Sequence, residues 1–380
     1  MKKVKVLHFT IANKGGGITK YALRIWEYID KEKFQCDFAT MSKKLDFAHE
    51  LEEQGCKIHY ISTYSEVDRL KFEEEINKIL DEDYDVLHLH TGWWRGFDIE
   101  KIAKKRKVPK VIVHAHNTGV SDVHLTVGMT REEAENLHYH WRQKVAMDIA
   151  TDFWACSERA AKWLYGDNIP EEVVRIMPNA IELDKFYYDE MTRTNYREEM
   201  GLTDKFVIGM IARFQYQKNH EFAIRFFEKL TYCVDDVVLL LIGIGDLEKD
   251  IRELVKEKGL EKKVYFLGAR KDVPELLQAM DLLILPSRFE GLPFVAIEAQ
   301  ATGLKCIVSD GISEEVKLTD NIQMLSLDED LWVKEAVKWL AGYERFDTSQ
   351  QLAAKGYRIN DQIKKIEALY SDFKRNLDLE

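Results

Sequence analysis

The chain has 380 residues, of which 46% are hydrophobic and 32% charged, a composition that predicts a globular protein with two domains of about 150–200 residues each. The net charge of −11 argues against a nucleic-acid partner, because nucleic-acid binding needs a basic surface. The sequence has no run of 18 apolar residues, so no membrane-spanning helix is predicted.

The first ten residues, MKKVKVLHFT, are basic and then apolar, as in a signal peptide. The apolar part is too short, however, and NKGGG follows it in place of a cleavage site, so this stretch is predicted to be the first core strand. The five cysteines are scattered and form no C-x-x-C pair. This pattern favours a reduced, cytoplasmic protein with no disulfides and no zinc site.

Short apolar runs alternate with longer stretches that are apolar at helical spacing, such as residues 18–32 and 220–230. This alternation predicts parallel sheets covered by helices on both faces. The predicted strands are 4–10, 36–40, 57–61, 85–90, 110–116, 152–157 and 174–179 in the first half, and 206–212, 237–243, 263–268, 281–286, 305–310 and 322–327 in the second.

These strands are too many for one open sheet, so the expected fold is α/β with two doubly wound, Rossmann-like domains. The polar stretch 187–199 is the best candidate for the boundary. We expect a first domain over residues 1–190, a second over 191–360, and a helix over 361–380 that packs back on the first domain. Ligands of such sheets bind beyond the carboxyl ends of the strands, where the main motifs lie.

Two motifs follow strand ends with the composition of an anion site. NKGGGITK, which includes Gly16 and Gly17, joins the first strand to a helix, and its glycines permit close approach of a ligand to the backbone. It matches neither G-x-G-x-x-G nor a P-loop, and a plain surface turn is the alternative. IGIGD, with Gly243, is a weaker signal of the same kind.

Two further motifs carry charged side chains. Arg213 and Lys218 lie on one strand-to-helix turn and suit a diphosphate, although a solvated pair is the alternative. In RFEGLPFVAIEAQ, a helix is expected to begin near Leu292, between Glu290 and Glu298. Their carboxylates would be roughly 9–12 Å apart, which is too far for a glycoside hydrolase pair. The spacing suits a nucleotide sugar, with hydroxyls at both ends and a diphosphate between them.

The segment EGLPFVAIE resembles the E-x7-E motif of retaining glycosyltransferases of the GT-B fold. More narrowly, the chain resembles family 4 and its bacterial exopolysaccharide and capsule enzymes. The resemblance covers nearly the whole chain and rests also on KGGGITK, VHAHNT, ACSERAAKWL, MPNAIELDKF, LIGIGD, VYFLGARKDV and the final helix. It implies transfer of a sugar from a nucleotide diphosphate sugar, with uridine the common base, to a hydroxyl of a glycan or lipid-linked acceptor.

The resemblance also implies roles for residues. Glu290 would hold the donor sugar, Glu298 the ribose, and Arg213 and Lys218 the departing diphosphate, while His116 would stabilise the reacting sugar. The implied catalytic residues are Glu290, His116, Arg213 and Lys218. The implied donor-binding residues are Gly16, Gly17, Arg213, Lys218, Gly243, Arg270, Glu290, Gly291, Leu292, Pro293, Phe294 and Glu298. No metal and no cofactor are expected, and the reaction would take place in a cleft between the domains.

Other functions fit the fold less well. A sugar-nucleotide epimerase of the same architecture and a non-catalytic nucleotide-sugar-binding protein are the alternatives, and a nicotinamide dehydrogenase is disfavoured because G-x-G-x-x-G is absent. DED at 81–83 is interpreted as a charge cluster at a helix end. The pairs His88/His90 and His114/His116 are interpreted as structural or cleft histidines, and HYHW at 138–141 as helix surface.

The basic run 101–110 is interpreted as a solvated helix end. Contact with anionic lipid at the inner face of the membrane is the alternative, and the nearby Trp93, Trp94 and Phe97 would support it.

Overall fold

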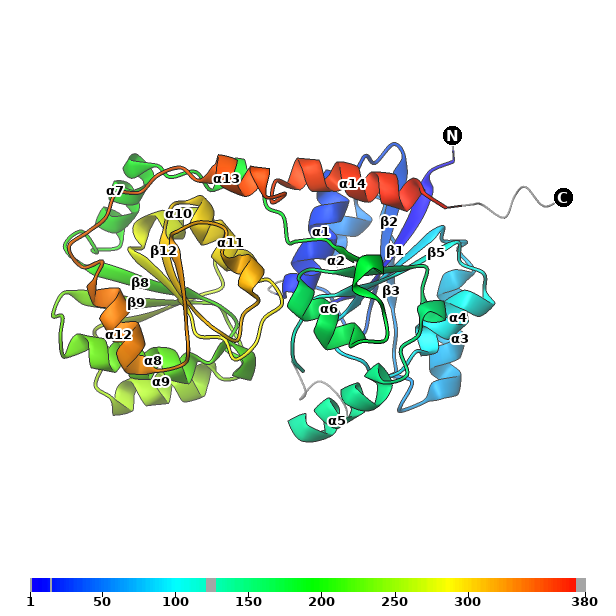
Figure 1. Ribbon diagram of the computed structural model, residues 1–380, viewed down its shortest axis with the longest axis horizontal. Coiled ribbons are helices and arrows are strands. Elements are labelled where there is room, and N and C mark those ends of the chain that lie inside the picture. The colour runs from blue at the N-terminus through cyan, green and yellow to red at the C-terminus, as the bar shows by residue number, and fades with distance from the viewer. Residues whose placement is uncertain (1, 14–15, 121–127, 374–380) are drawn as a thin grey trace. The chain divides into compact units, whose positions relative to one another are not determined.

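The computed structural model describes residues 2–13, 16–120 and 128–373, which form two compact α/β units (Figure 1). The first unit contains the described residues up to Asn179 together with those from Asn360 onward, and the second spans Ala180–Ile359. Each unit has one parallel sheet with helices on both of its faces. This architecture confirms the predicted fold class.

The sheet of the first unit has seven parallel strands in the order β3-β2-β1-β4-β5-β6-β7. The order reverses at β1, and β4 and then β5 continue on the other side. The strands are β1 (Val4–Ile11), β2 (Phe34–Thr40), β3 (Ile58–Tyr60), β4 (Val86–Thr91), β5 (Lys110–Ala115), β6 (Asp152–Ala155) and β7 (Val174–Ile176). The helices are α1 (Gly17–Tyr28), α2 (Ala48–Glu52), α3 (Arg69–Leu80), α4 (Asp98–Lys105), α5 (Arg131–Arg142) and α6 (Glu158–Tyr165).

Helix α14 (Ile359–Ser371) is the last described element, and it belongs to the first unit from Asn360 onward. Its Glu367 carboxylate accepts a hydrogen bond of 2.8 Å from the Asp30 amide just after α1. Its Tyr370 is fully buried, and the hydroxyl lies 2.6 Å from Nδ1 of His88 on β4. The end of the expected helix, residues 374–380, lies outside the described residues.

The sheet of the second unit has six parallel strands in the order β10-β9-β8-β11-β12-β13. The strands are β8 (Phe206–Ile211), β9 (Val237–Ile242), β10 (Val264–Gly268), β11 (Leu282–Leu285), β12 (Lys305–Ser309) and β13 (Ile322–Leu325). The helices are α7 (Glu190–Glu199), α8 (His220–Thr231), α9 (Glu248–Glu257), α10 (Val273–Ala279), α11 (Phe294–Ala301), α12 (Glu329–Val337) and α13 (Ser349–Ala354).

The central strands are apolar because both faces of each sheet are covered. All six residues of β9 and all four of β11 are buried, and these strands form the core of the second unit with α8 and Trp332. Such continuous apolar runs are the expected mark of parallel strands between two helical layers. Among the described residues, no helix has both the length and the apolar character that a membrane span requires.

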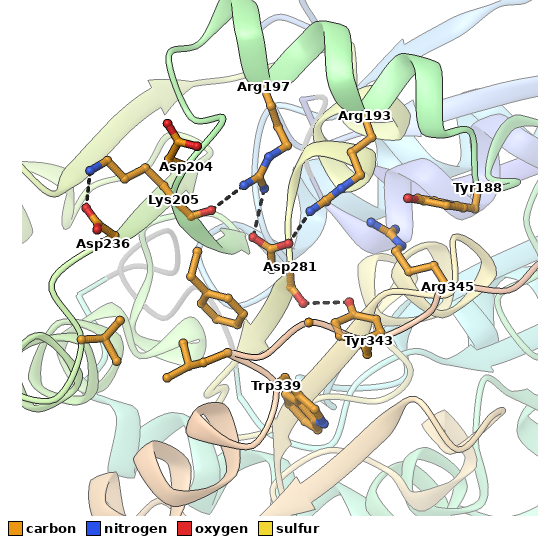
Figure 2. A pocket seen from close by; sticks show the side chains of 14 residues that line it. Tyr188, Arg193, Arg197, Asp204, Lys205, Asp236, Asp281, Trp339, Tyr343 and Arg345 are labelled. Carbon is orange, nitrogen blue, oxygen red and sulfur yellow. Dashed lines mark hydrogen bonds and ion pairs between the residues drawn. The ribbon is translucent and has the colours of Figure 1, made fainter.

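The polar stretch 187–199 mostly forms α7, which is tied to the second sheet by partly buried charges. Arg193 and Arg197 both pair with Asp281, which directly precedes β11 (Figure 2). The same carboxylate accepts a hydrogen bond of 2.7 Å from the amide of Val207 in β8. A helix that looks like a linker by composition is therefore an integral part of the second unit.

Asp281 also borders a cavity of about 370 Å³ at the amino ends of the strands (Figure 2). Its arginines are already engaged: Arg197 donates to the carbonyl of Ala279, and Arg345 donates to the carbonyls of Leu277 and Thr302. The cavity thus lies among structural contacts at the edge opposite to the predicted site residues.

Candidate functional site

The carboxyl edge of the second sheet gathers the predicted donor-binding residues in the order of the strands. Arg270 follows β10, Gly243 follows β9, Arg213 and Lys218 follow β8, and Glu290 follows β11. These four strands are neighbours, so residues far apart in the sequence lie along one edge. Gly16, Gly17 and His116 belong to the first unit.

Glu290 is the centre of this edge. Its side chain is buried, and its carboxylate accepts three side-chain contacts: an ion pair with Lys218, a 3.1 Å hydrogen bond from Nε2 of Gln217, and a 3.0 Å hydrogen bond from the Ser287 hydroxyl. Its amide donates to the carbonyl of Gly311 at 3.2 Å. A buried carboxylate with this many partners is held in one position, which a substrate-contacting group requires.

The loop that carries Lys218 is held against the loop of Glu290. The Arg288 amide donates to the carbonyl of Gln217 at 2.8 Å, and Nε2 of Gln217 also donates to the carbonyl of Phe289 at 3.0 Å. Asn219, between Lys218 and α8, has a left-handed backbone (φ 58°, ψ 49°), which asparagine tolerates well. The turn therefore sets the direction of the lysine side chain.

Gly243 supports the Arg213 loop from the neighbouring strand. With φ of 142°, it lies so close that an added Cβ would be 2.1 Å from the carbonyl oxygen of Ala212. The glycine at this position is thus explained by packing against the chain before Arg213, in addition to the donor contact that the resemblance implies. A side chain here would push the Arg213 loop away from β9.

Helix α11 begins two residues later than expected. Pro293 has an extended backbone (φ −73°, ψ 123°) and caps the helix, which starts at Phe294. Glu298 is therefore the fifth helical residue and is almost completely buried. Proline has no amide hydrogen, so only the amides of Gly291, Leu292 and Phe294 can serve as donors in this segment.

Arg270 is engaged by an acid of its own loop. Its guanidinium forms an ion pair with Asp272, which also accepts a 3.1 Å hydrogen bond from the hydroxyl of Tyr196 in α7. Gly268, two residues before Arg270, has a positive φ of 65°. Arg270 is exposed and would have to leave Asp272, or share it, to reach a nucleotide base.

The glycine-rich stretch of the first unit opens α1. Gly16 caps the helix, and an added Cβ at Gly17 would meet no atom within 4 Å, so this helix start is sterically open. Thr19 fastens the helix to the end of β1 through hydrogen bonds of 2.9 and 3.0 Å with the backbone of Ala12. Lys14 and Gly15 of the same motif lie outside the described residues.

His116 follows β5 and belongs to a cluster of five histidines. His8, His88, His90 and His114 are buried, while His116 is half-buried. Burial lowers the pKa of His8 and of His116 from the usual 6.5 to about 3, and it lowers the pKa of the other three well below 6.5. All five rings are therefore neutral at physiological pH.

The motifs DED and HYHW lie at the C-terminal ends of helices α3 and α5. Asp81 caps the end of α3 and pairs with Arg106, so DED at 81–83 is a helix-end cluster, as predicted. The surface assignment of HYHW is wrong for His138. This residue is fully buried, accepts a 3.0 Å hydrogen bond from the Trp94 amide, and stacks on Trp163.

Three residues, Gln217, Ser287 and His8, are not among the site residues predicted from the sequence. Gln217 and Ser287 hold the Glu290 carboxylate. The only sign of their role in the sequence is that each lies next to a segment that contains predicted site residues. His8 sits opposite His88 in the β1–β4 register, so the histidine pattern of β4 and β5 extends into β1.

Comparison with known proteins agrees with this geometry. Residues 16–180 match the model of the glycosyl transferase 4-like domain, and residues 192–326 match that of the glycosyl transferases group 1. The two models occupy separate parts of the chain, in agreement with the two sheets. The chain is a glycosyltransferase of the GT-B fold.

Two relatives match most of the chain. One is EpsF of Bacillus subtilis, classed as a glycosyltransferase, which is 28% identical over 97% of this chain and 96% of its own length. The other is the UDP-Gal:alpha-D-GlcNAc-diphosphoundecaprenol alpha-1,3-galactosyltransferase of Escherichia coli, which is 27% identical over 81% of this chain and 80% of its own length.

Solved structures support the fold. HepE of Anabaena, in complex with UDP and glucose, has a TM-score of 0.75 at 15% identity and covers 98% of this chain and 100% of its own. Sucrose-phosphate synthase of Thermosynechococcus elongatus has a TM-score of 0.75 at 16% identity, with 97% and 98% coverage.

Proposed function

We propose that the protein is a retaining glycosyltransferase that moves a sugar from a UDP-sugar to a hydroxyl of a glycan or lipid-linked acceptor, in exopolysaccharide or capsule biosynthesis. The observation that carries this proposal is the buried Glu290 carboxylate, fixed by Lys218, Gln217 and Ser287 at the carboxyl edge of the second sheet. A carboxylate accepts hydrogen bonds from pairs of sugar hydroxyls. The uridine nucleotide is proposed because one relative is named for UDP-Gal and one solved neighbour holds UDP.

In this proposal, Arg213 and Lys218 offset the charge that develops on the departing diphosphate. Both cations come from the loop after β8, and a guanidinium with an ammonium suits two adjacent phosphates. The start of α11 adds backbone amides that face the same charge. Because the two cations supply the charge that a metal ion supplies in other transferases, the reaction is proposed to need no metal.

Retention of configuration is proposed to occur on one face of the sugar. The leaving phosphate oxygen takes the proton of the acceptor hydroxyl as the new bond forms on the side that the phosphate leaves. No enzymic base is assigned. Glu298 is proposed to hold the ribose, and His116 to stabilise the reacting sugar.

The test is nucleotide release by the purified protein with UDP-, GDP- and ADP-sugars in the presence of a chelator, first without acceptor. We expect one UDP-sugar to release UDP slowly and independently of the chelator. With acceptor, NMR of the product should show the anomeric configuration of the donor. Inversion would contradict the retaining mechanism. If no donor is hydrolysed and none raises the melting temperature, the donor site itself is refuted.

We also propose that the basic run 101–110 contacts an anionic membrane surface. Trp94 and Phe97 are buried and cannot support it, and Lys104 and Lys110 are paired with acids. Three lysines of the run remain exposed and unpaired in the described part of the chain, and Lys101 and Lys144 flank the Trp141 ring at 5.9 and 4.9 Å. The three are Lys101, Lys105 and Lys107.

Reversing the charges of these three lysines is expected to weaken binding to vesicles that contain anionic lipid by at least roughly a hundredfold, because loss of each lysine alone costs about 1 kcal/mol and the reversed charge adds repulsion. Binding is measured by co-sedimentation, with neutral vesicles as the reference. The matched control is reversal of three exposed lysines of the second unit, Lys249, Lys256 and Lys262. Equal losses in the two triple variants would show a nonspecific charge effect and contradict a docking face.

A further inference from the structure

The five clustered histidines of the first unit form two hydrogen-bonded rows. In one row, Nδ1 of His8 lies 3.0 Å from Nε2 of His90, and Nδ1 of His90 lies 2.9 Å from Nε2 of His116. In the other, the Tyr370 hydroxyl lies 2.6 Å from Nδ1 of His88, and Nε2 of His88 lies 3.1 Å from Nδ1 of His114. Nothing in the proposed reaction requires four buried histidines behind His116.

The first row ends at His8, whose second ring nitrogen is not used by the row. Its Nε2 is buried and has no hydrogen-bond partner among the described residues, and the ring stacks on Phe38. A neutral imidazole carries one proton, so each hydrogen bond of the row has one donor nitrogen and one acceptor. The row therefore has only two arrangements of its protons, one directed from His8 to His116 and one directed the opposite way.

The two arrangements of the protons differ in whether Nε2 of His8 carries a proton. If protons are directed toward His8, its Nε2 carries an N–H group that is buried without an acceptor, a rare and costly arrangement. If they are directed toward His116, only a lone pair of His8 remains unused. The second arrangement is favoured, and it fixes each ring: His8 donates from Nδ1, His90 accepts at Nε2 and donates from Nδ1, and His116 accepts at Nε2.

We propose that His90, supported by His8, is a positioning residue that holds His116 in the tautomer with its proton on Nδ1. His116 then presents an N–H donor on the nitrogen that faces away from the row, and its other nitrogen is occupied. In this form it donates a hydrogen bond to a substrate oxygen and does not act as a proton acceptor there. The proposal deepens the role proposed for His116 and rests on it for its function.

A metal centre explains the cluster less well. Candidate ligand atoms of His8, His88 and His90, and of His90, His114 and His116, lie within 4.8 Å of one another, but neither group includes a carboxylate or a cysteine. Three neutral imidazoles can hold zinc, but such a site needs ring nitrogens that are available to ligate the ion. The same nitrogens are already paired at hydrogen-bonding distances of 2.9–3.1 Å.

The tautomer can be read directly from the intact protein. With 15N-labelled histidine, ring nitrogen–proton correlation spectra distinguish protonation at Nδ1 from protonation at Nε2, and the His116 signals are assigned by their loss in His116→Gln. We expect Nδ1 of His116 to be protonated. A proton on Nε2, or an average of both forms, overturns the proposal. The spectrum must not change when a chelator is added, because a change would show a bound metal.

Two substitutions at His90 test whether this residue fixes the tautomer of His116. His90→Asn keeps an N–H donor near the position of Nδ1, whereas His90→Phe keeps a ring and removes the donor. We expect the His116 tautomer to be retained in His90→Asn and lost in His90→Phe. His59→Gln is the matched control. His59 lies on β3 of the same sheet, outside the cluster, and its ring forms a hydrogen bond with the hydroxyl of Tyr84. An unchanged His116 tautomer in a folded His90→Phe overturns the proposal.

The kinetic consequence is measured separately. We expect His90→Phe to lower turnover by about a hundredfold, the loss typical of removing one hydrogen-bond donor at the reacting centre, with partial recovery in His90→Asn. Affinity for UDP should not change, because neither His90 nor His116 is assigned to a nucleotide contact. The tautomer is observed without substrate, so failure of the transferase proposal leaves this test intact. If the His116 tautomer is lost in His90→Phe as expected but turnover does not fall, the kinetic role of His90 alone is overturned.

Discussion

Glu290→Gln is expected to lower the rate of sugar transfer by roughly 10²–10³-fold, the usual loss when one fixed polar group at the reacting centre is removed. The amide keeps the size of the side chain and its contacts with Gln217 and Ser287, but it loses the charge that pairs with Lys218. Lys218 is then released for phosphate. Affinity for UDP is therefore expected to stay the same or to increase while turnover falls.

The measurement combines steady-state turnover with calorimetric titration of UDP, for Glu290→Gln, Lys218→Met and the double variant. Lys218→Met should weaken UDP binding, because it removes a cation from the diphosphate. A coupling energy between the two sites is expected, since they are in direct contact. Parallel losses of turnover and of UDP affinity in Glu290→Gln would mean that Glu290 only supports the loop, and the sugar contact would be excluded.

Asp281→Ala is expected to destabilise the protein by about 3 kcal/mol, the lower end of the cost of removing one partner from a buried ion pair, because the Asp281 side chain is 15% exposed. Asp281 binds Arg193 and Arg197 and accepts the amide of Val207, so its loss leaves two guanidinium groups without their counter-charge at the base of the second sheet (Figure 2). The two arginines lie on α7, and this helix should detach first.

Thermal and urea unfolding measure this effect, and Asp236→Ala is the control. Asp236 borders the same cavity, but its pair with Lys205 is exposed to solvent, so no measurable change is expected there. If both variants unfold like the wild type, Asp281 is not the anchor of α7. If both are equally destabilised, the effect belongs to the cavity as a whole.

The fold was predictable because its signals are local. Runs such as 237–243 and 281–286 are apolar throughout, and only a strand between two helical layers needs that pattern over so short a length. The start of α11 was misplaced by two residues, since Pro293 fits either the cap or the first helical position. The burial of His138 was missed because its partner, the Trp94 amide, lies 44 residues away.

The candidate site was predictable only as a set of separate residues. Sequence motifs placed Glu290 and Lys218 at strand ends and gave them separate ligands, the sugar and the diphosphate. Their direct contact depends on the pairing of β8 with β11, which joins segments 72 residues apart. The histidine row likewise depends on the register of β1 against β4, which fixes His8 beside His88 and which no local pattern specifies.

The return of α14 to the first unit has a consequence for exchanging parts between relatives. The second unit is one uninterrupted piece of chain, whereas the first is made of two pieces that flank it. The second unit can therefore be replaced as a single cassette with two junctions, near Asn179 and Asn360. The first unit cannot be isolated by cutting at one point, because a fragment that ends at residue 179 lacks Tyr370, which fills its core against His88 and Trp154. A self-sufficient first unit needs a short linker in place of the cassette.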